Sequence, residues 1–228
     1  DTHMKIEGNA VLTLQSRFFM DWNAVAKEKN RKDYAEAYFP IADKKGNTAM
    51  QIVASGPDDE DQTIKMGFLK MISQAKESIY IQTPYFIPDE SLHEMLKIAV
   101  LSGVKVKIMI PSKPDHPFVY RATEYFAKDI VEYGAEVYMY QNGFLHSKVI
   151  VVDDEIVSVG TANMDVRSFK LKFEINAFIY DRDVAEELIA NFDEDQKNCI
   201  RATHDYFAKQ SKWRKFKQAF SRLLSPIL

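Results

Sequence analysis

The sequence has 228 residues, 46% hydrophobic and 28% charged, which is enough for one substantial core and gives no sign of disorder. Its formal charge of -3 excludes attraction to phosphate or anionic membranes through the overall charge, so any such attraction must come from local patches. Cys199 is the only cysteine, which excludes an internal disulfide and a cysteine-rich metal site and favours a reducing compartment.

Residues 1–45 are predicted to be the tail of a preceding domain and a linker. Apolar residues recur at helical spacing between Ala10 and Asn30, and loop-forming residues follow between Pro40 and Thr48. The chain begins without an initiator methionine or a signal peptide, so we expect a fragment of a longer protein. No apolar run is long enough to cross a bilayer, so we expect the fragment itself to be soluble.

Strand and helix patterns alternate over residues 46–205. Strands are predicted at 50–54, 78–82, 104–110, 136–140, 144–152, 155–160 and 175–180, and helices at 63–75, 91–101, 118–133 and 183–199. Gly103 and Gly134 stand where helix C-caps are needed, and Asp153-Asp154 has the spacing of a hairpin turn. Repeated β-α units that end in a hairpin predict an α/β sandwich with a mixed sheet and helices on both faces.

The most informative segment runs from residue 143 to residue 163. Residues two apart on a strand point the same way, so His146 and Lys148 are predicted to share a face. Thr161 and Asn163 follow the return strand and can come back beside them as neutral hydrogen-bond donors. A lone histidine on an apolar strand is more often a core or edge residue, but the combination predicts a small anion site.

These residue types suit displacement at phosphorus. An imidazole supplies a nucleophile or acid with a pKa near neutrality, and the Lys148 ammonium and Asn163 amide can stabilise nonbridging oxygens. Asp153 has the wrong parity for the His146 face and lies in the turn, which favours a structural role.

The string His146-x-Lys148-x4-Asp153-x6-Gly-Thr-x-Asn163 resembles the HKD motif of the phospholipase D superfamily. Other segments are similar to bacterial cardiolipin synthases in particular, namely 1–22, 83–88, 110–117, 140–146, 163–169 and 173–181. The resemblance implies a phospholipase D-like α/β/α sandwich and catalysis by His146, Lys148 and Asp153. It also implies that no metal or cofactor is needed, and we expect the acidic run 58–61 to cap a helix rather than to bind a metal.

The resemblance adds further site residues. Glu174 matches the glutamate that hydrogen-bonds the motif histidine, although a plain surface charge is the alternative. Tyr85, Phe86 and His116 follow strand ends and are candidates for lining a pocket, with ordinary turn or packing roles equally open.

The chain holds one HKD motif, whereas the synthases carry two whose histidines meet in one site. The resemblance implies that one histidine forms a phosphohistidine while the other acts as acid and base, and we assign His146 the second role. The missing half lies upstream in the parent protein or is replaced by a second copy in a homodimer. The predicted reaction joins two phosphatidylglycerol molecules into cardiolipin and glycerol, and no nucleic acid is involved. The alternatives are a phospholipase D or nuclease acting as a homodimer, and a noncatalytic lipid-binding half.

Residues 206–228 are predicted to form a basic amphipathic helix. From Lys209 onward there are six basic residues and no acidic one, with aromatic and leucine residues at helical spacing. Such a helix can lie on an anionic membrane surface, or it can dock on the domain with a solvated basic face. The resemblance implies the cell membrane of a bacterium, with this domain on the cytoplasmic side.

Overall fold

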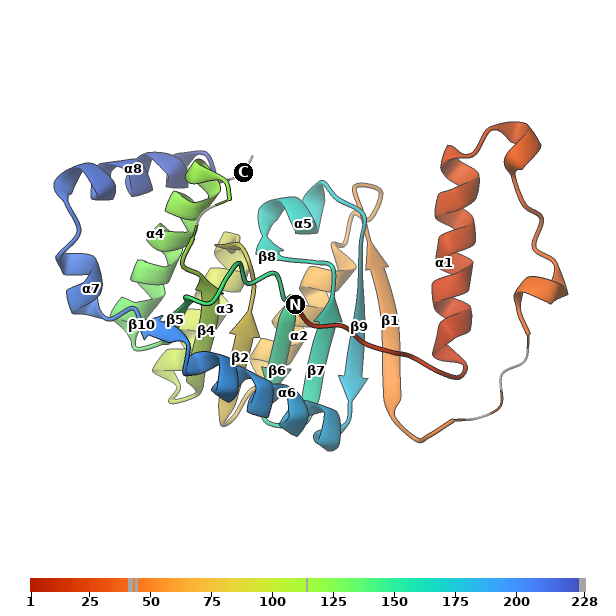
Figure 1. Cartoon of the computed structure of the whole chain (residues 1–228), viewed down its shortest axis with the longest axis horizontal. Coiled ribbons are helices and arrows are strands. Elements are labelled where there is room, and N and C mark those ends of the chain that lie inside the picture. The colour runs from red at the N-terminus through yellow and green to blue at the C-terminus, as the bar shows by residue number, and fades with distance from the viewer. Residues whose placement is uncertain (41–42, 44, 114, 226–228) are drawn as a thin grey trace.

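Runs rich in Val and Ile form an eight-stranded mixed sheet at the centre of the computed structural model, which describes residues 1–40, 43, 45–113 and 115–225 (Figure 1). The strands are β1 Ala49–Ser55, β2 Ser78–Gln82, β4 Lys105–Pro111, β5 Glu136–Tyr140, β6 Val149–Val152, β7 Ile156–Gly160, β9 Glu174–Tyr180 and β10 Cys199–Arg201. Their spatial order is β1-β9-β7-β6-β2-β4-β5-β10. β2, β4 and β5 are parallel, and the remaining neighbours are antiparallel.

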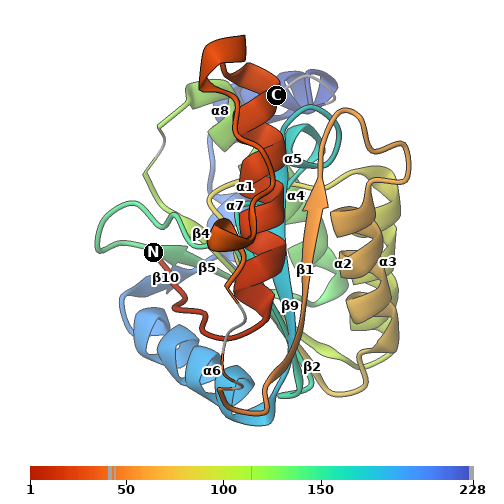
Figure 2. The ribbon, with the colours of Figure 1, turned by 90° about the vertical axis from the view of Figure 1, so that its right-hand side faces the viewer.

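Helices cover both faces of the sheet. α2 (Thr63–Gln74), α3 (Glu90–Leu101) and α4 (Pro117–Tyr133) lie on one face, and α6 (Arg182–Gln196) lies on the other (Figures 1 and 2). Gly103 and Gly134 follow α3 and α4 with φ of +91° and +113°, a backbone conformation that glycine adopts without strain. The predicted α/β/α sandwich with a mixed central sheet is confirmed.

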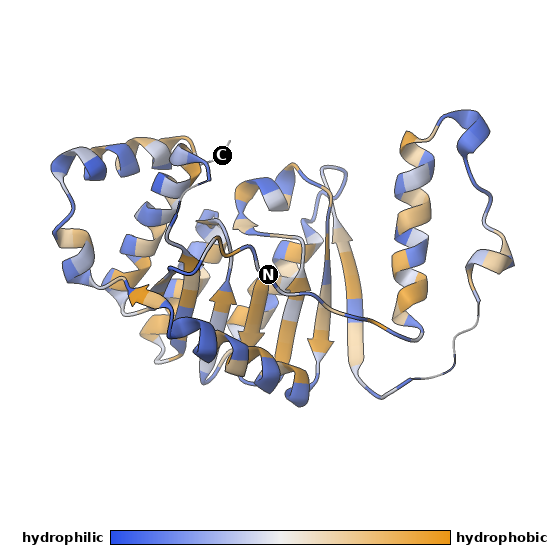
Figure 3. Cartoon of the chain, in the orientation of Figure 1, coloured by the Kyte–Doolittle hydropathy of each residue, from blue (hydrophilic) through white to orange (hydrophobic). Residues whose placement is uncertain are grey.

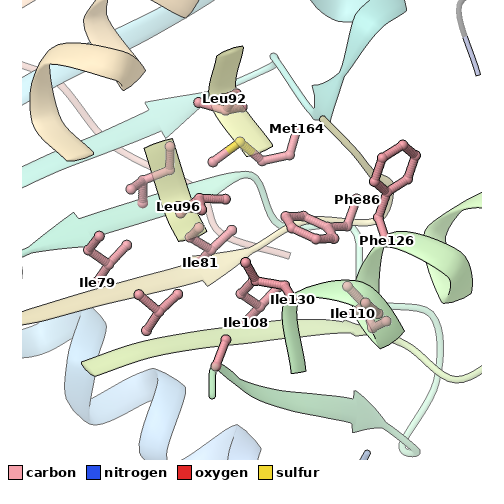
Figure 4. Packing of buried hydrophobic residues seen from close by; sticks show 14 of the residues in the cluster. Ile79, Ile81, Phe86, Leu92, Leu96, Ile108, Ile110, Phe126, Ile130 and Met164 are labelled. Carbon is pink, nitrogen blue, oxygen red and sulfur yellow. The ribbon is translucent and has the colours of Figure 1, made fainter. Parts of the chain in front are cut away.

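Alternation along each strand divides the core between the two faces. On β2, Ile79 and Ile81 are fully buried under α2, α3 and α4, whereas Tyr80 packs on the α6 side against Phe192 (Figure 4). β6 is therefore apolar along its whole length and β4 from Ile108 onward, and the outer surfaces of the helices are hydrophilic (Figure 3). Burial on both faces holds the sheet rigid beneath the loops at its ends.

Three predicted elements differ from the structure. The strand expected at 144–152 forms only from Val149, because its neighbour β2 ends at Gln82 and the following Pro84 has no N–H to continue the ladder. The helix expected to reach Cys199 ends at Gln196, and Cys199 starts β10 on the edge of the sheet beside β5. β1 pairs with β9 at the far edge, so three strands separate it from β2.

The N-terminal helix α1 (Ala10–Val25) stands beside β1, at the edge of the molecule (Figures 1 and 2). Phe19 is buried in a small aromatic cluster formed with the returning chain, its ring 5.1 Å from Tyr34, 5.1 Å from Tyr38 and 5.4 Å from Phe39. Of the rest of the predicted apolar stripe, Val11, Phe18, Trp22 and Val25 are exposed. Residues 41, 42 and 44 of the predicted linker lie outside the described residues, and the division at residue 45 stays a prediction.

The C-terminal segment forms two short helices instead of the one predicted. α7 (His204–Ala208) and α8 (Lys212–Leu223) are separated by a turn, and the Ser211 hydroxyl accepts a hydrogen bond from the Arg214 N–H at 3.2 Å to cap α8. Residues 226–228 of the predicted helix lie outside the described part. Within residues 1–40, 43, 45–113 and 115–225, no helix is both long and apolar enough to cross a membrane.

The hairpin between β6 and β7 is tied to the start of β2. Asp153 and Asp154 lie in its turn with φ of +51° and +54°, a conformation that Asp tolerates better than most residues. The Asp153 carboxylate accepts hydrogen bonds from the backbone N–H groups of Lys76 (2.7 Å), Glu77 (2.8 Å) and Ser78 (2.9 Å). One carboxylate therefore satisfies three donors at the point where β2 begins.

We expect Asp153→Asn to lower the free energy of unfolding by about 1–2 kcal/mol, since the amide group loses one acceptor oxygen and the charge that strengthens these bonds. Urea denaturation followed by circular dichroism measures the loss. Asp154→Asn makes the same change at the neighbouring turn position with φ near +54°. An equal effect of the two substitutions would contradict the role of the Asp153 carboxylate.

Candidate active site

The motif residues lie at the end of the sheet where three parallel strands terminate. The chain leaves β2 at Thr83, β4 at Ser112 and β5 at Gln141, and it enters β6 at Val149 opposite Gln82. Ligands of α/β proteins bind at the carboxyl ends of parallel strands. The segments predicted to surround the site, 83–88, 110–117 and 140–148, therefore meet at one edge, although Pro114 lies outside the described residues.

His146 and Lys148 share the exposed side of an extended segment. Leu145 and Ser147 are buried, with 4% and 3% of their surface exposed, whereas the His146 side chain is 56% exposed. Period-two alternation thus continues ahead of β6 although the ladder has ended. The Lys148 Nζ donates to the backbone carbonyl of His146 at 2.6 Å, and this bond holds the ammonium close to His146.

Gly160 permits a close approach of β7 and β9 beside these residues. A Cβ at position 160 would lie 2.3 Å from the Ile175 carbonyl oxygen and 2.4 Å from the side chain of Asn176, which is far too close. Asn176 is buried and uses this space to accept a hydrogen bond from the Ala162 N–H (3.2 Å) and to donate one to the Ser158 hydroxyl (3.0 Å). The glycine of the motif therefore sets the path of residues 161–163.

Asn163 is buried, with 4% of its surface exposed, beneath the return segment. Its Nδ2 donates to the Asp165 carboxylate at 3.1 Å, and its backbone N–H donates to the Ser168 hydroxyl at 3.1 Å. Its Oδ1 is buried and has no hydrogen-bond partner in the described part of the chain. Asn163 is therefore oriented by Asp165 and Ser168.

Asp165 and Ser168 were not predicted as site residues. Asp165 caps the short helix α5 (Val166–Lys170) by accepting from the Ser168 N–H at 2.6 Å. Asp is a preferred residue directly before a helix, so Asp165 is a helix-start signal that the sequence contained. Thr161 lies at the same edge, where its Oγ1 accepts from the Ile175 N–H at 2.9 Å.

The predicted pocket-lining residues have different surroundings. Phe86 is fully buried in the core, where β3 (Phe86–Ile87) pairs with β8 (Met164–Asp165), so its predicted place in a pocket is wrong. Tyr85 is partly exposed and its hydroxyl donates to the carboxylate of Asp115. His116 is exposed at the start of α4, and its backbone N–H donates to the Asp115 Oδ1 at 2.7 Å.

Glu174 does not take the position predicted for it beside His146, and Asp153 has the structural turn role expected from its parity rather than the catalytic role that the resemblance implies. Glu174 starts β9 but makes no hydrogen bond to His146, whose Nδ1 instead lies 3.4 Å from the Asp1 carboxylate. Asp153 lies at the opposite end of β6, five residues from Lys148 along the chain. At 3.3 Å per residue this places Asp153 roughly 16 Å away, and the structure does not bring it to the site.

Burial and neighbouring charges set the protonation of the site. Desolvation and the Lys148 charge lower the pKa of His146, so the imidazole is predominantly neutral at pH 7. Desolvation lowers the pKa of Lys148 to about 8, with Glu174 opposing the shift and Lys172 reinforcing it. Desolvation raises the pKa of Glu174, against a hydrogen bond from Thr161 and the charge of Lys172. A neutral imidazole therefore stands beside an ammonium that is still mostly charged.

Lys172 is a further basic residue of this edge, which sequence reasoning missed. Its charge acts on His146, Lys148 and Glu174 alike, so it belongs to the same electrostatic cluster. In the residues that the structure describes, no group of three or more His, Cys, Asp or Glu side chains is placed to hold a metal ion.

Comparison with known proteins gives consistent matches over the whole chain. Residues 68–196 match the family model described as "Cardiolipin synthase, PLD-like domain". The chain is 57% identical over 228 residues to the cardiolipin synthase of Listeria welshimeri and 54% identical to the major cardiolipin synthase ClsA of Bacillus subtilis. Each match covers 100% of this chain and 47% of the relative, so the chain spans about half the length of these curated relatives.

Solved structures share the fold at lower identity. Nuc from Salmonella typhimurium, a phospholipase D family member, is 21% identical with a TM-score of 0.60 and covers 69% of this chain and 99% of its own. Phosphatidylserine synthase from Haemophilus influenzae is 17% identical with a TM-score of 0.63 and covers 79% of this chain and 48% of its own.

We expect the Lys148 amine to titrate with a midpoint near pH 8 and Glu174→Gln to move this midpoint lower, because the Glu174 charge stabilises the ammonium. Competitive acetylation across a pH series, with mass spectrometry of the peptide that holds Lys148, measures the midpoint. The matched control is Glu94→Gln, on the exposed side of α3. A Lys148 midpoint above pH 10, or one that Glu174→Gln raises, would show that burial does not control this amine.

Proposed function

The chain belongs to the family of cardiolipin synthase PLD-like domains, and from this premise we propose that it is one catalytic half of a phosphatidyltransferase. The predicted resemblance to the phospholipase D superfamily and to bacterial cardiolipin synthases is confirmed. The proposed reaction joins two phosphatidylglycerol molecules to give cardiolipin and glycerol. We place the enzyme at the cell membrane of a bacterium, with this domain on the cytoplasmic side and phosphatidylglycerol or related anionic phospholipids as substrates.

The observation that carries the proposal is the common side on which His146 and Lys148 lie at the edge of the sheet. The neutral imidazole can accept a proton or attack phosphorus, and the ammonium can stabilise negative charge on a nonbridging oxygen. Asn163 and Thr161 lie on the adjoining return segment, where hydrogen bonds fix both side chains. These groups can bind and polarise a phosphodiester without further protein ligands.

The proposed reaction has two displacements at one phosphorus atom. In the first, an imidazole nitrogen attacks the phosphatidyl phosphorus, the bond to the glycerol oxygen breaks, and a second imidazolium donates its proton to the leaving oxygen. In the second, a hydroxyl of another phosphatidylglycerol gives its proton to the second imidazole and attacks phosphorus, and the nitrogen–phosphorus bond breaks. The first imidazole returns to its initial state, and cardiolipin leaves.

We assign the acid and base role to His146. A lowered pKa suits the removal of a proton from the accepting hydroxyl. For proton donation, the bound anionic phosphodiester raises the pKa of the ring by favouring its charged form. Lys148 and Asn163 are assigned to the nonbridging oxygens, and Glu174 acts on the site through the charge of Lys148.

The second histidine has to come from outside the described site. His3, His93, His116 and His204 are the other four histidines, and none begins a complete His-x-Lys-x4-Asp string, because His3 has Lys5 two residues later but Ala10 in place of the Asp. The curated relatives are about twice as long as this chain, which favours a preceding half that supplies the second motif. A second candidate is a phosphodiesterase that acts as a homodimer, because Nuc aligns over 99% of its length with this one domain. A noncatalytic lipid-binding half is the third possibility.

We expect His146→Ala, in the full-length enzyme, to lower the rate of cardiolipin formation by at least about 10³-fold, since the group assigned to carry the proton is then absent. Mass spectrometry of products from phosphatidylglycerol vesicles measures the rate. His204→Ala removes an exposed histidine outside the site and should leave the rate unchanged.

The 228-residue chain alone should be nearly inactive as a monomer, because one imidazole cannot be nucleophile and leaving-group acid at once. Full activity of His146→Ala would favour the noncatalytic half. Turnover by a verified monomer would contradict the two-histidine reaction, and DNA cleavage by a dimer of this chain would favour the homodimeric phosphodiesterase.

A further inference from the structure

The C-terminal helix α8 docks on the domain through its polar side. Gln218 and Ser221 are buried against α4, with 2% and 1% of their surface exposed. Glu124 of α4 is fully buried and accepts hydrogen bonds from the Gln218 amide at 3.1 Å and from the guanidinium of Arg214. Arg121 of α4 completes the network with a hydrogen bond of 2.5 Å to Glu124. Charged and amide groups, rather than apolar packing, hold this helix.

The consequence is that the apolar side of α8 faces outward. Trp213, Phe216, Phe220 and Leu223 have 63%, 58%, 48% and 74% of their surface exposed. At 3.6 residues per turn these four side chains, here called the aromatic face, lie within an arc of about 80°. The rings of Trp213 and Phe216 stack with centroids 5.5 Å apart. A surface helix normally buries such a stripe against the core. The exposure of this stripe therefore indicates an interaction surface.

Basic side chains border the aromatic face. Helical spacing places Lys212 at one side of the arc and Lys217 at the other, and the Lys217 Nζ lies 5.3 Å from the centre of the Trp213 ring. From Lys209 to the end of the sequence there are six basic residues and no acidic one, in a chain whose formal charge is -3. Of these six, Lys212 and Lys217 border the aromatic face, whereas Arg214 is bonded to Glu124 on the docked side, so two positive charges flank the face and make it complementary to an anionic surface.

The helix also lies at the same end of the sheet as the candidate active site. Its partners Arg121 and Glu124 belong to the first half of α4, which begins just after the loop that leaves β4. Figure 1 shows α8 lying across the top of α4, with its C-terminal end pointing toward α5. A flat surface that contacts the aromatic face would thus lie at the end of the sheet where the His146 side chain is exposed.

We propose that the aromatic face of α8 inserts into the interfacial region of an anionic lipid bilayer, while Lys212 and Lys217 contact the headgroups. A second protein is a poorer fit, because four side chains cover a few hundred Å², well below the roughly 800 Å² per partner of a stable protein interface. Aromatic and leucine side chains between lysines match the layered polarity of a bilayer surface. The proposal deepens the proposed function and rests on it only for the choice of phosphatidylglycerol as the anionic lipid.

Vesicle flotation of the 228-residue chain tests the proposal. We expect binding to vesicles of phosphatidylcholine with about 30% phosphatidylglycerol, and weak binding to phosphatidylcholine alone. The variant Trp213→Ser with Phe216→Ser and Phe220→Ser should lose at least about tenfold in affinity. The control replaces Phe18, Met20 and Trp22 with Ser on α1, where they are equally exposed, and should bind like the unchanged chain.

The charges are tested separately. Lys212→Glu with Lys217→Glu should abolish the preference for phosphatidylglycerol. Lys27→Glu with Lys29→Glu makes the same change in net charge on exposed residues after α1 and should preserve most of the preference. Equal losses in the two variants would show that overall charge, and not the border of the aromatic face, controls binding.

Fluorescence gives a readout that does not depend on whether the triple variant folds. The chain has two tryptophans, so Trp22→Phe leaves Trp213 as the single reporter. We expect its emission to shift to shorter wavelength when phosphatidylglycerol vesicles are added. An unshifted emission, or a triple variant that changes the association state of the chain but not its vesicle binding, would overturn the proposal. His146→Ala should keep full vesicle binding, which separates this proposal from the proposed reaction.

Discussion

The hydrogen-bond ladder between β2 and β6 stops at Gln82 and Val149, and the candidate site exists because it stops there. Beyond this pair, Pro84 offers no N–H, so residues 144–148 run extended without a paired strand on the β2 side. Alternation still turns Leu145 and Ser147 into the protein and His146 and Lys148 outward. A ladder longer by two residues would have covered this edge. Because the pairing ends here, the imidazole is surrounded by the loops that follow β2, β4 and β5 and not by paired strands.

Holding the Lys148 ammonium half-buried near a second lysine costs free energy, which the rest of the folded domain must offset. Lys148 is half-buried near Lys172, and its pKa falls to about 8 because the protein solvates the ammonium less well than water does. A bound phosphodiester would add negative charge beside Lys148 and so favour its charged form. Rigid supports keep the cationic groups in place meanwhile. The Gly160 contact and the bonds of Asn176 to residues 158 and 162 fix the return segment, and the core beneath it is closed.

Patterns in the sequence were sufficient for elements that depend on local spacing, and insufficient where a distant partner decides. Apolar residues at strand spacing located β2, β4 and β5, and Gly103 and Gly134 marked the helix ends correctly. The spacing of His146 and Lys148 predicted their common side because alternation is a property of extended backbone itself. No local pattern shows that the Asp153 carboxylate binds the amides of residues 76–78, or that Phe86 enters the core through the pairing of β3 with β8. Glu174 was placed by analogy, and its contacts depend on side-chain packing that spacing does not encode.

The two helices at the ends of the described chain, α1 and α8, show why amphipathic spacing predicts a face but not its partner. Both have an exposed apolar stripe, yet their surroundings differ. The helix α1 contains one Arg and one Asp, which pair with each other, and no lysine. Its apolar stripe therefore suits an apolar protein surface such as a further domain. The stripe on α8 is bordered by lysines and is turned outward by the buried carboxylate of Glu124 on α4. A buried glutamate that attracts the polar side of a helix thus determines which side remains for the lipid, and this choice could be read only from the packed structure.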